Sequence, residues 1–136
     1  MFDGTDCLYY DCSPPVLAGG STPARLKYRD YSYQRPSQCD GKFHRETERV
    51  AAMSTGWFNG GSRCGKMIRV FGGDGRSVVA EVVDECDSFN GCDFEREGMP
   101  QCGNDIIEGS DAVWDGLGLN NKDYLGKNVN VAWSMA

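Results

Sequence analysis

The sequence predicts a mainly β fold, a small closed β-barrel with one helix on its side. Residues 66–71 and 77–83 are two alternating apolar runs joined by a Gly- and Asp-rich loop, which is typical of a β-hairpin. Residues 128–134 alternate in the same way and indicate a half-buried strand at the C-terminus. Several short strands followed by one helix and a last strand are typical of a small barrel with a packed interior.

The hairpin is the best-defined element. In its first strand, Ile68 and Val70 fall on one face, whereas Lys66 and Arg69 are expected at the rim or outside. In its second strand, one face is expected to carry Val78, Ala80 and Val82, and the opposite face Val79, Glu81 and Val83. Residues 24–31 and 49–55 are weaker strand candidates.

One helix is predicted near the C-terminus. Ser110 is expected to cap it with its side chain, and Asp111 places a negative charge at the positive end of the helix dipole. Gly118 provides a stop. The apolar stripe of this helix consists of Val113, Trp114 and Leu117.

Length and charge limit the classes of function. The 136 residues are enough for one domain with a real core, so residues 1–136 are expected to form a single domain. The net charge of −6 excludes the basic surface that sequence-independent nucleic-acid binding needs, and an anionic membrane would repel the chain. No apolar run is long enough to span a bilayer. We expect a monomer when the protein is free.

The start of the chain, MFDGTDC, has neither the basic region nor the apolar stretch of a signal peptide. We therefore expect Met1 to be a recombinant start on a mature or trimmed protein.

The cysteines are dispersed and none forms a Cys-x-x-Cys pair. This spacing argues against a structural zinc site, which typically uses two close ligand pairs. In a small acidic chain it indicates disulfides and an oxidising compartment outside the cytosol. Buried free thiols in a reducing compartment are the alternative. The seven positions are Cys7, Cys12, Cys39, Cys64, Cys86, Cys92 and Cys102.

An odd number of cysteines leaves at least one outside intramolecular bridges. The best single prediction is a Cys86–Cys92 bridge, because Asn90-Gly91 supplies a tight turn between them. Cys7, near the chain start, is expected to be the one left over. The other six are the structural disulfide candidates, and their pairing is otherwise open.

Six motifs extend along most of the chain: CSPPV (12–16), CDGKFH (39–44), STGWFNGGSRC (54–64), GRSVVAEVVDECDSFNGCD (75–93), NDIIEGSDAVWDGLG (104–118) and VAWSM (131–135). Together they resemble those of kiwellins, secreted cysteine-rich plant proteins also called ripening-related proteins. The resemblance implies a six-stranded double-psi β-barrel, related to barwin and to the N-terminal domain of expansins, with one or two short helices and long disulfide-pinned loops. Full-length kiwellins usually carry a further cysteine-rich N-terminal segment, whose absence would explain an unpaired Cys7.

The resemblance also implies a function. Some kiwellins bind and inhibit a chorismate mutase that a fungal pathogen secretes, so the expectation is a defence protein of the plant apoplast that binds a pathogen-secreted protein. This chain departs from the family pattern at residues 27–38, where KYRDYSYQRPSQ replaces a Gly- and Asp-rich loop. A carbohydrate-binding or cell-wall-modifying module, and a paralogue acting in ripening or development, are the alternatives.

Catalysis is not expected, and neither a cofactor nor a metal is. A glycan-cleaving site needs two carboxylates, one of them kept protonated, and the candidates are Asp84, Glu85, Asp87 and Glu108. We expect Glu108 to be a loop carboxylate that accepts backbone N–H groups near the helix start, and Asp84 to satisfy the backbone of a strand crossing. His44, the single histidine, is expected to be structural or at the rim.

An acidic group near the end of the hairpin raises the possibility of a calcium site, but it lacks the ligand spacing and the twelve-residue loop of an EF-hand. We expect a solvated loop instead. The group consists of Asp84, Glu85, Asp87, Asp93 and Glu95.

Binding through exposed loops is the stronger hypothesis, because Tyr and Arg are enriched at interface hot spots. Two loops carry such residues. The three tryptophans, Trp57, Trp114 and Trp133, are expected in the core rather than in a ligand platform. The predicted partner-binding residues are Tyr28, Arg29, Tyr31, Tyr33 and Arg35 in the first loop, and Phe89, Phe94, Arg96 and Met99 in the second.

Overall fold

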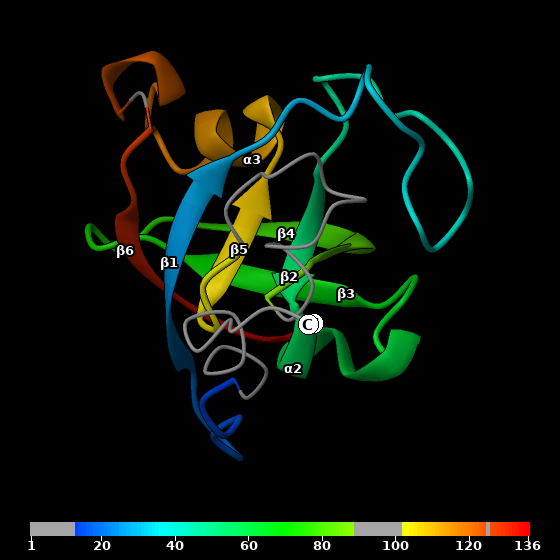
Figure 1. The fold of residues 1–136 in the computed structure, drawn as a ribbon. Coiled ribbons are helices and arrows are strands. Elements are labelled where there is room, and N and C mark those ends of the chain that lie inside the picture. Colours follow the sequence, from blue (N-terminus) through cyan, green and yellow to red (C-terminus); the bar gives the residue numbers. More distant parts are fainter. Residues whose placement is uncertain (1–12, 89–101, 125) are drawn as a thin grey trace, which may run out of the picture.

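The computed structural model describes residues 13–88, 102–124 and 126–136, and within them six strands close into a barrel (Figure 1). Around the barrel the order is β1-β5-β2-β4-β3-β6. The pairs β1/β5 and β2/β4 are parallel and the other four are antiparallel. The strands are β1 (Thr22–Tyr28), β2 (Val50–Ser54), β3 (Met67–Phe71), β4 (Ser77–Cys86), β5 (Ile106–Gly109) and β6 (Val129–Met135). The expected mainly β fold, a six-stranded closed barrel, is confirmed.

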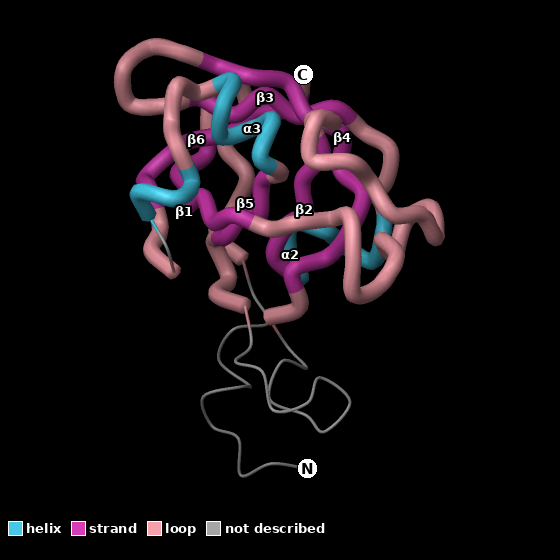
Figure 2. The backbone as a smooth tube through the Cα atoms, turned by 90° about the horizontal axis from the view of Figure 1, so that it is seen from above, coloured by secondary structure: helices cyan, strands magenta, loops and turns pink. Residues whose placement is uncertain are grey.

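Short helices close the two ends of the barrel. Helix α2 (Thr55–Phe58) continues directly into the 3-10 turn η1 (Asn59–Gly61), and helix α3 (Asp111–Gly116) precedes the turn η3 (Asn121–Tyr124). In Figure 1, α3 lies at the upper end and α2 at the lower end, and Figure 2 looks down on the barrel from the α3 side.

The predicted hairpin is confirmed as β3 and β4, with Ile68 opposite Ala80 and Val70 opposite Val78. The C-terminal strand is also confirmed, and it closes the barrel between β1 and β3. The two weaker candidates are strands as well, but β1 starts earlier than predicted and ends at Tyr28. Residues 29–31 therefore belong to the following loop.

Alternation fills the barrel interior with apolar side chains. Leu26, Ile68, Val70 and Trp133 point inward and are fully buried. Trp57 and Trp114 are each 1% exposed, so the prediction that all three tryptophans lie in the core is confirmed. The Trp57 and Trp133 rings meet edge to face with centroids 5.3 Å apart, a favourable aromatic geometry.

A β-bulge interrupts the alternation of β4. Ala51 of β2 is opposite Val82, but the next residue, Ala52, is opposite Asp84, so Val83 is the extra residue. A bulge re-aims the side chains that follow it. Val83 consequently joins a second buried apolar cluster outside the barrel interior, together with Tyr31, Val50, Ala52, Cys86, Cys102 and Ile106.

Helix α3 has the predicted apolar stripe, but Ser110 does not cap it with its side chain. The Ser110 hydroxyl instead donates to the Glu48 carbonyl at 2.6 Å, which ties the helix start to the segment before β2. The Ser110 carbonyl accepts from the amides of Val113 and Trp114. Gly118, with φ +73°, follows the helix as expected.

The described disulfides correct one prediction. Cys86 is bonded to Cys102 and not to Cys92, so the Cys86–Cys92 prediction is wrong. Cys102 precedes β5, and its amide donates to the Asp87 carbonyl, which places Cys102 beside the end of β4. Cys39 is bonded to Cys64. Cys7, Cys12 and Cys92 lie outside the described residues.

The close packing of α3 on β5 gives a stability prediction. A Cβ added at Gly109 would lie 2.8 Å from Val113 Cγ1 and 3.1 Å from Leu26 Cδ1. We expect Gly109→Ala to lower the free energy of unfolding by about 1–3 kcal/mol, because overpacking forces the helix away from the barrel. Chemical denaturation measures this loss. Gly73→Ala is the matched control, because nothing lies within 4 Å of its added Cβ. Equal effects of the two substitutions would contradict the packing argument.

Candidate functional site

The loop between β1 and β2, residues 29–49 (the β1–β2 loop), stands out from the barrel on one side (Figure 1). It is fastened at its middle by the Cys39–Cys64 disulfide. The Cys39 amide also donates to the Val83 carbonyl at 2.9 Å, so the loop is bonded to the bulged residue of β4. These fixed points make the loop a defined surface although it contains no strand.

Aromatic side chains on this loop face solvent. Tyr33 is 58% exposed and Phe43 is 52% exposed, and Arg35 is exposed as well. Tyr28, at the end of β1, is 36% exposed and its hydroxyl donates to Glu46. Burial and this carboxylate together raise the pKa of Tyr28. The sequence reasoning missed Phe43, for which a large apolar residue inside a polar stretch was the available signal.

Two of the predicted interface residues do not face solvent. Tyr31 is 3% exposed and packs in the second apolar cluster, and its hydroxyl donates to the Glu108 carbonyl at 2.5 Å. The Arg29 side chain is 18% exposed, and its guanidinium lies over the Tyr31 ring at 4.7 Å from the centroid. The expected exposure of these two residues is therefore wrong. Both residues pack between the loop and the barrel and so support the loop.

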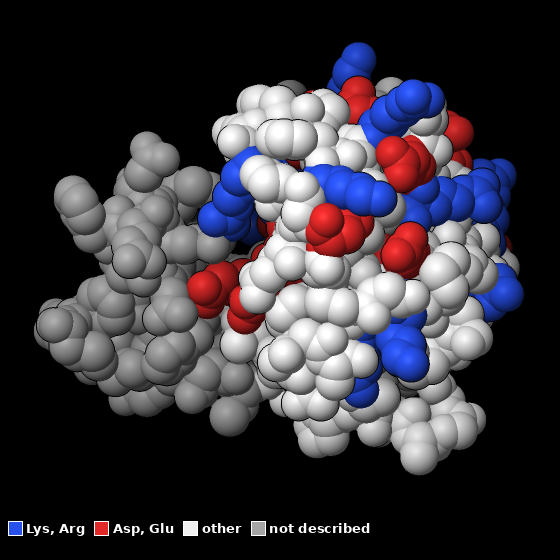
Figure 3. Space-filling view, turned by 90° about the vertical axis from the view of Figure 1, so that its right-hand side faces the viewer, with Lys and Arg blue, Asp and Glu red and all other residues white. Residues whose placement is uncertain are grey.

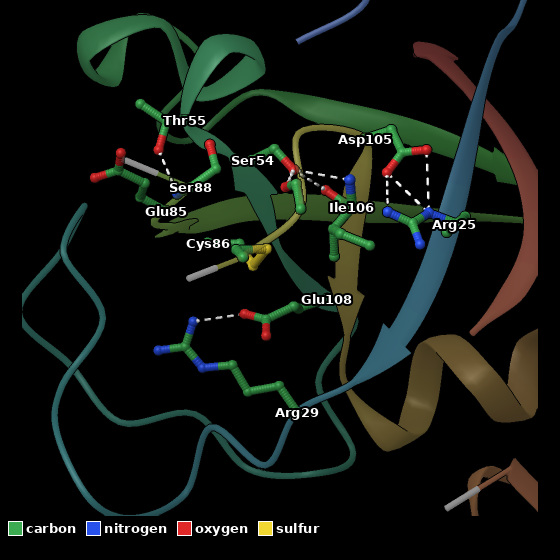
Figure 4. Close-up of a disulfide and its surroundings, with 12 residues drawn as sticks. Arg25, Arg29, Ser54, Thr55, Glu85, Cys86, Ser88, Asp105, Ile106 and Glu108 are labelled. Atoms are coloured by element: carbon green, nitrogen blue, oxygen red, sulfur yellow. Dashed lines mark hydrogen bonds and ion pairs between the residues drawn. A yellow bond between two sulfur atoms is a disulfide. The ribbon is translucent and has the colours of Figure 1, made fainter. Parts of the chain in front are cut away.

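Arg29 bridges two carboxylates at the base of the loop. Its Nη2 donates to Asp84 at 2.6 Å and its Nη1 to Glu108 at 3.2 Å. Figure 4 shows Arg29 reaching from the end of β1 toward Glu108 on β5, beside the disulfide at Cys86. The Asp84 side chain is 5% exposed, because the bulge turns it inward under the loop. Its Oδ1 also accepts the amide of the next residue, Glu85, at 2.7 Å, which is a local bond and not the expected one to the backbone of a strand crossing.

This network corrects the expectation for Glu108. Glu108 lies on strand β5, not in a loop, and its side chain accepts from Arg29. Burial opposes the charge on Arg29, but Tyr31, Glu108 and Asp84 outweigh it and raise the pKa of the guanidinium. For Tyr31, burial disfavours the charged phenolate and raises the pKa of the hydroxyl well above its usual value. Two carboxylates paired with one permanent cation fit a structural network better than a glycosidase, which needs one neutral carboxylic acid.

A small pocket of about 130 Å³ opens between the β1–β2 loop and the end of β4. Carboxylates from β4 and the residues after it form one side, and the loop forms the other. Its lining consists of Arg35, Pro36, Gln38, Asp84, Glu85 and Asp87.

His44 lies in the β1–β2 loop between two carboxylates and is 8% exposed. Its Nε2 is 2.8 Å from Asp40 Oδ2, and its Nδ1 is 3.0 Å from Glu48 Oε1. Burial opposes protonation, but the hydrogen bonds and charges of Glu48 and Asp40 outweigh it and raise the pKa of His44 above 6.5. A structural role, as expected, agrees with this geometry.

Charges of both signs are interspersed over the side of the molecule that carries the loop (Figure 3). Within residues 13–88, 102–124 and 126–136, no group of three or more His, Cys, Asp or Glu is arranged to hold a metal ion. In the same part of the chain, no helix has the length and apolar character to cross a membrane. The second predicted loop, with Phe89, Phe94, Arg96 and Met99, lies outside the described residues, as do Asp93 and Glu95.

Comparison with known sequences shows which proteins this chain is similar to. Residues 2–136 match the family model described as Kiwellin-1. The chain is 53% identical over 131 residues to "Kiwellin" from Actinidia chinensis var. chinensis, covering 93% of this chain and 59% of that protein. It is also 53% identical to "Ripening-related protein grip22" from Vitis vinifera, of which it covers 57%. The chain thus spans just under three fifths of the length of these relatives.

Solved structures share the barrel at low sequence identity. An expansin from Clavibacter michiganensis in complex with cellohexaose superposes with a TM-score of 0.62 at 17% identity, over 86% of this chain and 50% of that one. The Streptomyces papain inhibitor superposes with a TM-score of 0.56, also at 17% identity, over 88% of this chain and 97% of that one. At this identity the likeness concerns the fold alone.

Proposed function

The chain belongs to the kiwellin family, and from that membership we propose that it is a secreted plant defence protein that binds a pathogen-secreted protein. Binding, and not turnover, is its action, and occlusion of the partner is the mode of inhibition. The partner we propose is a secreted fungal chorismate mutase, the target that the family resemblance implies. The dispersed cysteines and the two described disulfides support secretion into an oxidising compartment such as the plant apoplast.

One observation carries the proposal: the β1–β2 loop holds Tyr33 and Phe43 exposed on a fastened backbone. Large aromatic side chains on a preorganised loop bury much area at low entropic cost. Arg35 lies on the same loop and fits the arginine enrichment of interfaces. The Streptomyces papain inhibitor, which shares the fold, supports the use of such a barrel as an inhibitor scaffold. Contact of Tyr28, Tyr33 and Arg35 with a partner stays a prediction.

We expect the double substitution Tyr33→Ala and Phe43→Ala to weaken the complex by about 30-fold or more, the cost of removing a hot spot. Both side chains are largely exposed, so folding should be unaffected. Calorimetry with a secreted fungal chorismate mutase measures the affinity, and size exclusion shows the complex.

Met67→Ala is the matched control, because Met67 is 44% exposed but lies on β3, outside the loop. It should leave the affinity unchanged. If Met67→Ala weakens the complex and the loop substitutions do not, the interface lies elsewhere. If wild-type protein forms no complex, a pull-down from infected plant fluid tests other secreted partners.

A carbohydrate-binding or cell-wall-modifying module is the second candidate, since the barrel is also that of an expansin. The Arg29 bridge to Asp84 and Glu108 argues against hydrolysis at this position. Retention on insoluble cellulose or chitin, without loss on Tyr33→Ala and Phe43→Ala, would favour this candidate over protein binding.

A further inference from the structure

His44 links two parts of the β1–β2 loop. The first half follows Cys39, and the second half leads into β2. Asp40 follows the disulfide-bonded Cys39, and Glu48 lies just before β2. Each ring nitrogen of His44 is within 3.0 Å of a different carboxylate, so the imidazole joins these two points across the loop. Phe43, which is 52% exposed, is the residue directly before it.

The two halves have different anchors. The second half is bonded to helix α3, because the Ala112 amide donates to the Glu46 carbonyl at 3.0 Å and the Ser110 hydroxyl donates to the Glu48 carbonyl. The first half is held by the Cys39–Cys64 bridge. The His44 side chain links one half to the other, and its amide donates to the Tyr31 carbonyl at 3.0 Å.

The chemistry of imidazole makes this link depend on a proton. A neutral imidazole has one N–H donor and one acceptor nitrogen, so it can donate to only one carboxylate and presents a lone pair to the other. The imidazolium donates to both, and both bonds are then charge-assisted. The geometry at Asp40 and Glu48 therefore favours the protonated form.

The carboxylates also organise the backbone around the ring. Asp40 Oδ1 accepts the Lys42 amide at 3.0 Å, and Glu48 Oε2 accepts the Arg45 amide at 2.8 Å. The charged side chains that face the ring are Asp40 and Glu48, and the His44 amide is bonded to the uncharged carbonyl of Tyr31 in the same loop. Release of the ring from one carboxylate would free that turn of the loop.

We infer that the His44 imidazolium is a latch that holds the β1–β2 loop in its presented conformation and that deprotonation loosens the loop around Phe43. The latch regulates the surface named in the proposed function, so its consequence for a partner rests on that proposal. The latch itself is a property of the free protein and is tested there.

The pH range follows from the directions of the shifts. The pKa of His44 is raised above 6.5, so the stabilisation by its charged form is fully present below pH 6.5 and is lost as the pH rises through the higher folded value. The hydrogen bond from His44, and next that from the Arg45 amide, lower the pKa of Glu48 below 4.5. Its contribution is present above pH 4.5 and is lost only as the pH falls through that lower value. The latch is thus closed in mildly acidic fluid.

The single histidine gives an unambiguous measurement. We expect an NMR titration of the one imidazole to give a pKa above 6.5. We also expect amide exchange at Lys42, His44 and Arg45, corrected for intrinsic rates, to be about three- to tenfold faster at about pH 8 than at about pH 5.5, the scale of a partly exposed ion-pair link. Amides of β4 are the internal reference and should not change.

His44→Gln should give the fast exchange of the loop amides at both pH values, because an amide side chain does not titrate. Glu48→Gln, which keeps the histidine, should lower the pKa of His44 and reduce the pH effect. A His44 pKa at or below 6.5, or loop exchange in wild-type protein that is equal at both pH values, overturns the inference. If the latch titrates as expected but no partner is found, the proposed function fails and the latch stands.

Discussion

Replacing Arg29 with Met should lower the free energy of unfolding by about 3–5 kcal/mol, the usual cost of leaving buried charges without their partner. Arg29 neutralises Asp84 and Glu108 at once, and the three side chains are 18%, 5% and 19% exposed. Met fills a similar volume, so the loss reflects charge and hydrogen bonding and not a cavity. Urea unfolding at pH 7 measures it.

The control is Arg25→Met on β1, the strand that Arg29 directly follows. Arg25 also pairs with a carboxylate across the β1/β5 contact, Asp105 at 2.6 Å, but these side chains are 41% and 28% exposed. A solvent-accessible pair contributes about 0–1 kcal/mol, so this substitution should cost far less. Equal losses at the two arginines would show that burial is not what makes the Arg29 network important.

Neutralising the two acids should rescue the Arg29→Met variant. We expect the further substitutions Asp84→Asn and Glu108→Gln to restore at least about half of the lost stability, because no buried charge then lacks a partner. If the two neutralising substitutions restore no stability, packing and not charge was lost in Arg29→Met.

The barrel could be predicted from the sequence because its evidence is local. Alternation in β3, β4 and β6 is a property of consecutive residues, and it identifies the inward face without any tertiary contact. The burial of Trp133 follows from the alternation of β6, and that of Trp114 from the apolar stripe of α3. The partner of Cys86 depends on which segment returns to the end of β4, and sequence distance misled the choice of Cys92 over Cys102.

The network of Arg29 with Asp84 and Glu108 could not be predicted for a related reason. The bulge at Val83 shifts the register of β4 by one residue, and this turns Asp84 under the β1–β2 loop to meet Arg29. Nothing in the local pattern places Glu108 on the same arginine, because β1 and β5 are far apart in the chain. The four-residue spacing of Asp40, His44 and Glu48 was visible, but in a segment without a helix it carried no geometric meaning.

Removing the Cys39–Cys64 bridge with the double substitution Cys39→Ala and Cys64→Ala should lower the free energy of unfolding by about 3.5 kcal/mol. The bridge closes a segment with a sequence separation of 25, and this figure is the chain entropy that it removes from the unfolded state. Thermal and urea unfolding under oxidising conditions measure the loss.

The comparison with the other described bridge separates stability from presentation of the loop. Cys86→Ala with Cys102→Ala opens a separation of 16 and should cost a similar amount, about 3 kcal/mol. Only the first pair fastens the β1–β2 loop, and without it Cys39 keeps one backbone bond, to Val83. We therefore expect faster amide exchange at Lys42 and weaker partner binding only in the Cys39/Cys64 variant. If both variants lose binding equally, the bridges act through global stability, and the loop needs no fastening to present Tyr33 and Phe43.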